Sequence, residues 1–88
     1  MNAAAVDVVV KARFDSKTMD PVDAWQVRRD DLGTLKWKPH RGHPRFLEPC
    51  VVWDGDPQRK VRRVILTSIT IVGLQTQAAR VLLFPRPQ

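Results

Sequence analysis

The sequence predicts a small, mainly β protein, and three observations support this fold class. Residues 6–14 alternate between apolar and polar side chains, which is the pattern of a half-buried strand. Residues 59–74 contain the densest run of β-branched side chains, which pack well on a pleated sheet. Turn sequences with glycine, proline and aspartate lie between the apolar segments. We therefore expect about five short antiparallel strands in a partly open SH3-like or OB-like barrel, with an open α+β sheet as the second possibility.

The length of the chain limits its organisation. A chain of 88 residues is expected to form a single domain over 1–88. Its content of 43% hydrophobic and 27% charged residues is that of a globular protein, so a packed core is expected rather than disorder. At the C-terminus we expect a turn over 73–77, a last strand over 78–84 and a flexible tail over 85–88.

Residues 21–32 fit two local structures. Asp20 is a suitable residue to cap a helix, and Pro21 suits the first helical position. However, Trp25 and Val27 alternate with polar neighbours, as they would in a strand. We expect at most one short helix in the chain, and we place it here.

The middle of the chain is expected to form a basic loop followed by a hairpin. Residues 34–49 contain three prolines, which argue against a long regular element, although the first few residues could form a short strand. Residues 50–53 are apolar and predict a buried strand, and Asp-Gly in residues 54–57 predicts a hairpin turn. The strand expected over 59–74 changes the parity of its apolar positions at Thr67-Ser68, which indicates a bulge or a bend there, with burial of the strand on both faces as the alternative.

Charge gives the main indication of function. The 15 Lys and Arg residues exceed the 9 Asp and Glu residues, for a net charge of +6. Such an excess favours a polyanionic partner. Residues 36–46 and 59–63 concentrate this positive charge, and the first segment also contains the rings of Trp37 and Phe46. We therefore expect a nucleic-acid-binding module with phosphate-backbone contacts and aromatic stacking. The candidate residues are Lys36, Trp37, Lys38, His40, Arg41, Arg45, Arg59, Lys60, Arg62 and Arg63. Because neighbouring strand residues point to opposite faces, only one of Arg62 and Arg63 is expected on any single surface.

A metal site and an enzymatic function are less favoured. His40, His43 and Cys50 are residue types that bind zinc, but no paired motif fixes their geometry. Asp54 and Asp56 could share a divalent cation in a hydrolase, but this spacing is also that of a hairpin turn. No nucleophile and base are arranged for catalysis. We therefore expect no catalytic residues, no metal and no cofactor.

The alternative function is protein interaction, by an inhibitor, an adaptor or a subunit of a larger assembly. The three tryptophans are more than a minimal core is expected to hide, and an exposed apolar patch or strand edge would then bind a protein partner or a second copy in a homodimer. No segment is long and apolar enough to span a bilayer, so no membrane is expected. The single cysteine, Cys50, cannot form an internal disulfide and favours a cytoplasmic location with Cys50 buried.

Overall fold

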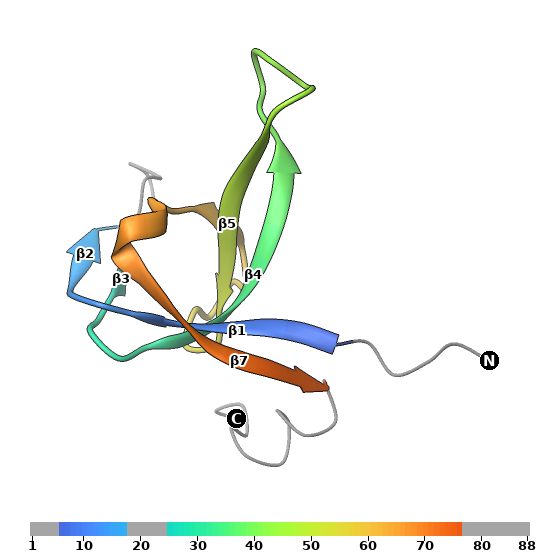
Figure 1. The fold of residues 1–88 in the computed structure, drawn as a ribbon. Helices are drawn as coiled ribbons and strands as arrows, with labels where there is room; N and C mark the ends of the chain where they lie inside the picture. The colour runs from blue at the N-terminus through green and yellow to red at the C-terminus, as the bar shows by residue number, and fades with distance from the viewer. Residues whose placement is uncertain (1–5, 18–24, 77–88) are drawn as a thin grey trace.

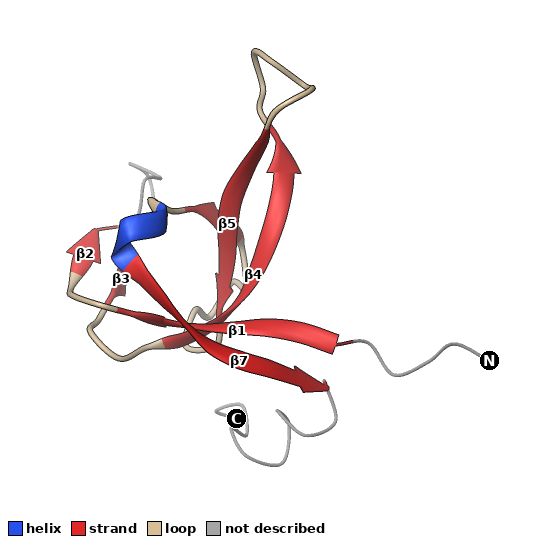
Figure 2. Ribbon diagram, viewed as in Figure 1, coloured by secondary structure: helices blue, strands red, loops and turns tan. Residues whose placement is uncertain are grey.

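The computed structural model describes residues 6–17 and 25–76, and these residues form strands and one short helical turn (Figures 1 and 2). The mainly β prediction is confirmed. In chain order the elements are β1 (Val6–Ala12), β2 (Ser16–Lys17), β3 (Gln26–Val27), β4 (Leu32–Pro39), β5 (Leu47–Trp53), β6 (Val61–Arg63), the 3-10 turn η1 (Leu66–Ser68) and β7 (Ile69–Thr76).

Five strands form one antiparallel sheet in the order β6-β5-β4-β1-β7. Strands β2 and β3 form a separate two-stranded sheet. Strands β6 and β7 are consecutive in the chain but lie at opposite edges of the large sheet, and the segment with η1 connects them (Figure 1). In the described part of the chain β6 and β7 do not pair, so the sheet does not close into a barrel. The last described strand, β7, lies beside the first.

The core lies on one face of the sheet, which we call the inner face. Val10 and Ala12 of β1 have the same parity and are buried there, as the alternation of residues 6–14 predicts. The buried cluster consists of Val10, Ala12, Val27, Val51, Trp53 and Ile69, with Val8, Trp25, Leu35 and Val64 packed against it.

The opposite, outer face of the sheet also buries side chains. Val9 breaks the alternation of the sequence, and it is fully buried opposite Thr34, which is buried too. Cys50 on β5 is buried on the same face, as predicted. The paired residues Gly73, Val9, Thr34, Val52 and Val61 form one row across all five strands and define this face.

The prediction of a single strand over residues 59–74 is wrong. The segment forms two strands at opposite edges of the sheet. The change of parity at Thr67-Ser68 coincides with η1, so a bend and not a bulge lies there. The bulge lies later, where Val72 has no partner between the pairs Val10–Ile71 and Val9–Gly73. The predicted turn at 73–77 is also wrong over its described part, because β7 continues to Thr76.

Two further expectations change in the described residues. Residues 25–32 contain strand β3 and a turn instead of the favoured helix, and the strand alternative at Val27 is confirmed because its side chain is buried in the core. Most of the predicted loop at 34–49 belongs to β4 and β5, and only residues 40–46 connect them. The predicted last strand at 78–84, the tail at 85–88 and the start of the predicted helix lie outside the described residues.

Gly33 provides a stability prediction because β4 and β5 approach closely there. A Cβ atom at Gly33 would lie 2.9 Å from the Val52 carbonyl oxygen, 3.0 Å from the Trp53 ring and still closer to Val51. We therefore expect Gly33→Ala to lower the free energy of unfolding by about 1–3 kcal/mol, measured by urea denaturation. Gly55→Ala is the matched control, because a Cβ atom at Gly55 has no neighbour within 4 Å. Equal stability of the two variants would contradict this packing.

Candidate nucleic-acid interface

Strands β4 and β5 extend beyond the rest of the sheet as a two-stranded ribbon (Figure 1). Strand β4 pairs with β1 only through residues 32–34, whereas it pairs with β5 along residues 33–39. On its other side β5 pairs with β6 only through residues 50–52. We call residues 36–49 the arm. It contains most of the basic segment that the sequence singles out.

The pairing register gives the arm two different faces. Lys36 and Lys38 lie opposite Cys50 and Glu48, and Cys50 in turn lies opposite Arg63 on β6. Side chains of directly paired residues share a face, so these cations lie on the outer face around Cys50. We call Lys36, Lys38 and Arg63 the cationic cluster. All three are exposed, and none forms an ion pair within the described part of the chain.

The electrostatics around Cys50 agree with this placement. Burial raises the pKa of the Cys50 thiol above its ordinary value, and the Glu48 carboxylate raises it further. The charges of Lys38 and Arg63 act in the opposite direction, which places both cations near the thiol. Cys50 therefore stays a neutral buried thiol at physiological pH rather than a reactive thiolate.

Trp37 lies on the other face of the arm. It pairs with Pro49, and its neighbour Pro39 pairs with Leu47, so these side chains share the inner-face side of the ribbon. Trp37 and Leu47 are about half or more exposed, at 49% and 59%. The sequence interleaves Trp37 with lysines, but the strand separates them by face. A single surface therefore does not combine the Trp37 ring with Lys36 and Lys38.

Hydrogen bonds and ring contacts among residues of the arm fix the conformation of its tip. The His40 N–H donates to the Phe46 carbonyl at 2.8 Å, and the Gly42 N–H donates to His40 Nδ1 at 3.0 Å. His40 Nε2 lies 3.4 Å from Glu48 Oε1, so both ring nitrogens of His40 have protein partners. The His43 ring lies between the rings of His40 and Phe46, with centroid distances of 5.6 and 6.1 Å. Arg41 and Arg45 are exposed at this tip.

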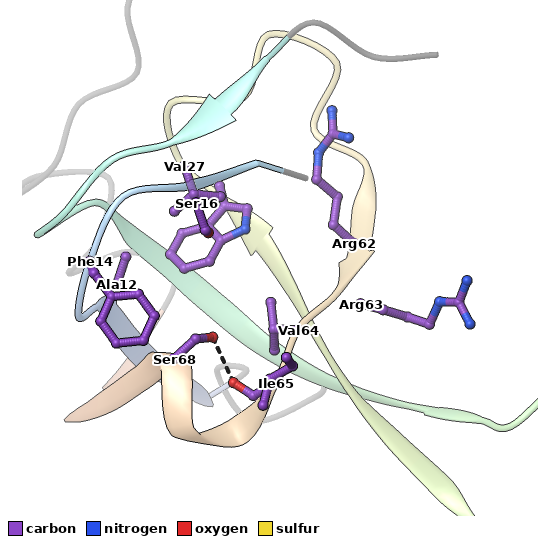
Figure 3. Close-up of a pocket in the computed structure, with 10 residues that line it drawn as sticks. Ala12, Phe14, Ser16, Val27, Arg62, Arg63, Val64, Ile65 and Ser68 are labelled. Atoms are coloured by element: carbon purple, nitrogen blue, oxygen red, sulfur yellow. Dashed lines mark hydrogen bonds between the residues drawn. The ribbon is translucent and has the colours of Figure 1, made fainter. Parts of the chain in front are cut away.

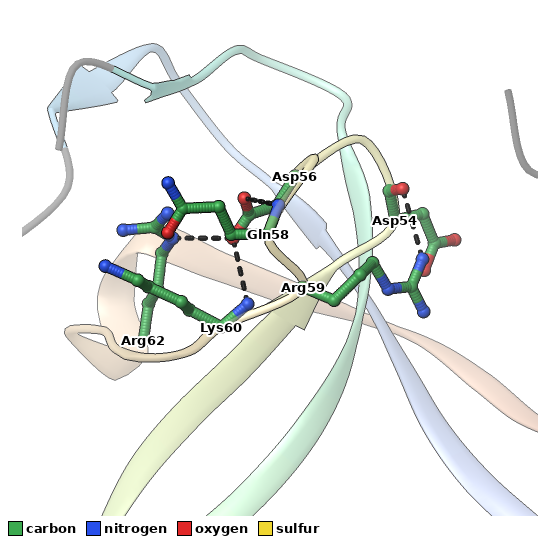
Figure 4. Close-up of polar contacts among 6 residues, drawn as sticks. All are labelled: Asp54, Asp56, Gln58, Arg59, Lys60 and Arg62. Atoms are coloured by element: carbon green, nitrogen blue, oxygen red, sulfur yellow. Dashed lines mark hydrogen bonds and ion pairs between the residues drawn. The ribbon is translucent and has the colours of Figure 1, made fainter. Parts of the chain in front are cut away.

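The second basic run, residues 59–63, is divided between the surface and the interior, since Lys60 and Arg63 are exposed and Arg62 is buried. Asp56 is buried and accepts hydrogen bonds from Arg62 Nε at 2.8 Å, from the Gln58 N–H at 2.9 Å and from the Lys60 N–H at 3.2 Å (Figure 4). The Arg62 side chain is only 4% exposed. The Arg62 guanidinium also lies 5.4 Å from the centroid of the Trp25 ring.

The contacts of this hairpin show where the other candidate residues of 54–63 lie. The expected hairpin turn at residues 54–57 is confirmed, and Asp56 organises it through its hydrogen bonds. Arg59 donates from a guanidinium nitrogen to the Asp54 carbonyl oxygen at 3.2 Å, within the same hairpin. Of Arg59, Lys60, Arg62 and Arg63, only Arg63 is brought next to Lys36 and Lys38 by the register.

The Asp56 contacts predict a loss of stability in acid. Burial alone raises the pKa of Asp56, but hydrogen bonds from Arg62, Gln58 and Lys60 and the Arg62 charge lower it below its ordinary value of 3.8. A carboxyl group with a depressed folded-state pKa stabilises the fold above its unfolded-state pKa, and this contribution disappears as the pH falls through the folded-state pKa. The urea midpoint should therefore fall as the pH decreases below about 4. Asp56→Asn should lack this part of the decrease, and an identical acid profile in the variant would contradict the assignment.

An apolar pocket of about 140 Å³ lies where the connection between the two sheet edges passes the end of β1 (Figure 3). Phe14 and Ile65 line it together with buried Ala12 and Val27. The Ser68 hydroxyl donates to the Ile65 carbonyl oxygen at 2.6 Å and fixes the adjacent turn. The sequence does not predict this pocket, because its lining depends on the path that residues 64–68 take between the edge strands β6 and β7.

The metal-binding candidates do not come together. Asp56 is surrounded by nitrogen donors, Cys50 is buried on β5, and His40 is engaged within the tip. Across residues 6–17 and 25–76, no three His, Cys, Asp or Glu side chains are grouped so that they could hold a metal ion. Within the same residues, no helix has the length and apolar character needed to cross a membrane.

Comparison with known proteins adds no further assignment. No protein-family model, curated protein or solved structure matches the chain.

Proposed function

We propose that the protein is a small, non-enzymatic nucleic-acid-binding module that binds through the outer face of the arm. The observation that carries this proposal is the cationic cluster of Lys36, Lys38 and Arg63, which the register gathers on one face without ion pairs among the described residues. Several cations on one surface can meet several phosphates at once, which is the main source of affinity for nucleic acid.

The proposed contact set is narrower than the sequence suggests. It consists of the cationic cluster with Arg41 and Arg45 at the tip, all exposed. Arg62 is left out because it is buried against Asp56. Trp37 lies on the other face, so Phe46 at the tip, 68% exposed, is the ring best placed to stack on a base. A cytoplasmic location, which the single buried thiol favours, belongs to the same proposal.

A salt-dependent titration tests the proposal. Fluorescently labelled DNA and RNA oligonucleotides, single- and double-stranded, are titrated with the protein at several salt concentrations, and anisotropy is recorded. We expect micromolar or tighter binding at low salt, with an affinity that decreases linearly with salt on a double-logarithmic plot. Absence of binding to all four ligands at low salt would exclude this function.

A second candidate is self-association through β7. In the described part of the chain β7 pairs only with β1, and it contains no charged residue and no proline. Ile71 and Leu74 are 64% and 69% exposed. An uncharged edge strand can pair with another strand, and two β7 strands in an antiparallel pair would bring no like charges together despite the net charge of +6. The partner in this candidate is a second copy of the chain.

Light scattering over a range of protein concentrations tests the self-association. A dimer that Leu74→Lys converts to a monomer supports it, since a lysine on each strand would introduce like charges at the pair. A monomer at all concentrations would exclude it.

A further inference from the structure

The arm has the dimensions of an element that enters a nucleic-acid groove. From Lys36 to the end of β4 at Pro39 the chain rises about 10 Å at the rise of a strand, and residues 40–46 extend the arm beyond that point. The major groove of B-form DNA is about 12 Å wide and about 8.5 Å deep and admits a two-stranded ribbon, whereas the minor groove, about 6 Å wide, is too narrow. The arm is a two-stranded ribbon that projects from the sheet (Figure 1).

The cations lie at both ends of this ribbon. Lys36 and Arg63 are at its base, in the same cross-strand row as Cys50. Arg41 and Arg45 are at its tip, in the connection between β4 and β5. The strand from Lys36 to Pro39 separates base and tip by about 10 Å and the connection adds to this distance, so the two ends can reach phosphates on both sides of a major groove about 12 Å wide.

The distribution of rings and cations over the two faces of the arm favours one class of nucleic acid over the others. A single strand is usually held by several aromatic rings on which successive bases stack beside the cations. Here Trp37 lies on the face opposite Lys36 and Lys38, which leaves Phe46 at the tip as the exposed ring near the cations of the arm. Double-stranded RNA has a deep and narrow major groove that side chains do not enter. B-form DNA offers a groove that matches the ribbon, with guanine O6 and N7 as acceptors for lysine donors.

We infer that the ligand is double-stranded B-form DNA, with the outer face of the arm in the major groove. This inference rests on the proposed function and specifies its substrate class. Lys38 lies in the middle of the inserted face, where its ammonium group can donate to base edges. Glu48 is directly opposite Lys38, and its carboxylate lies 3.4 Å from His40 Nε2. Because His40 Nδ1 accepts from the Gly42 N–H, Nε2 is the nitrogen of His40 that can donate to this carboxylate.

Competition between ligands of matched sequence tests the inference. The wild-type chain is titrated at one salt concentration with duplex DNA of about 20 base pairs, enough for two turns of groove, with single-stranded DNA of the same sequence and with duplex RNA. We expect duplex DNA to bind at least about ten-fold more tightly than either of the others. Methyl green, which occupies the major groove, should displace the protein, and netropsin, which occupies the minor groove, should not.

The outcomes separate the inference from the proposed function. Equal or tighter binding of single-stranded DNA or duplex RNA, or displacement by netropsin alone, overturns the major-groove inference and leaves nucleic-acid binding in place. Absence of binding to every ligand removes both.

A variant at the arm tip tests the geometry separately. Arg41→Ala/Arg45→Ala should reduce the slope of the logarithm of the binding constant against the logarithm of the salt concentration by about 2 for duplex DNA, because each variant position would lose one contact with a DNA phosphate. Arg28→Ala/Arg29→Ala removes the same charge at exposed positions in the turn before β4, at the end of this strand opposite the tip. An equal effect of the two double variants on the salt dependence would show that overall charge, rather than the arm, determines binding, and would overturn the inference.

Discussion

Replacing Asp56 with alanine should lower the free energy of unfolding by about 3–5 kcal/mol. The side chain of Asp56 is fully buried and that of Arg62 is only 4% exposed, so the variant would leave a buried guanidinium without its carboxylate. The backbone N–H groups of Gln58 and Lys60 would lose their acceptor as well. Total stabilities of single domains are about 5–15 kcal/mol, so this loss is large for a chain of this size.

Urea denaturation followed by tryptophan fluorescence measures the effect of Asp56→Ala. Asp56→Asn is a milder variant, since its amide oxygen can still accept a backbone hydrogen bond while the charge that balances Arg62 is absent. Its loss should be about 1.5–3 kcal/mol, the range for hydrogen bonds to a charged group. Asp54→Asn in the same turn serves as the control, because Asp54 is only partly buried. If Asp56→Ala is no less stable than Asp54→Asn, the buried pair does not hold the hairpin.

Replacing the cationic cluster should have the largest effect on nucleic-acid binding. The triple variant Lys36→Ala/Lys38→Ala/Arg63→Ala is expected to weaken binding on the order of 10- to 100-fold near physiological salt, and to reduce the slope of the salt dependence by about 3 if each cation meets one phosphate. The side chains are exposed, so the fold should be retained. Anisotropy titrations at several salt concentrations measure both quantities.

The matched control for the triple variant removes the same charge elsewhere. Lys11, Arg28 and Arg29 are exposed and lie outside residues 36–49, so none belongs to the arm. Lys11 is 3.8 Å from Asp30. Alanine at these three positions should leave most of the salt dependence unchanged. If this control loses as much affinity as the triple variant, binding follows net charge and the cationic cluster is not the interface.

Local sequence features were sufficient to predict several parts of the fold. The alternation along residues 6–12 predicted β1, because one buried face and one wet face require a period of two. The apolar residues 50–53 and the Asp-Gly turn after them predicted the end of β5 and its hairpin. The Asp54 and Asp56 spacing was correctly interpreted as a turn, because short acidic side chains hydrogen-bond to nearby backbone N–H groups.

The candidate site was predicted only in part. The sequence located both basic runs, and Lys36, Lys38 and Arg63 come from them. It gave no means to decide which of Arg62 and Arg63 is buried, because that depends on the position of Asp56 across the hairpin. A shift of one residue in a strand moves a side chain to the other face, so the register and not the composition determines which cations share a surface.

By itself, the sequence determined that the chain forms strands, where its first strand and its Asp-Gly turn lie, and that it carries an excess of positive charge. These properties depend on the preferences of neighbouring residues. Only the tertiary structure decided that residues 59–74 divide between the two edges of the sheet, and that Trp37 lies opposite the lysines on either side of it. The physical reason is that strand propensity does not specify the partner strand, and pairing between distant segments fixes the face on which each side chain lies.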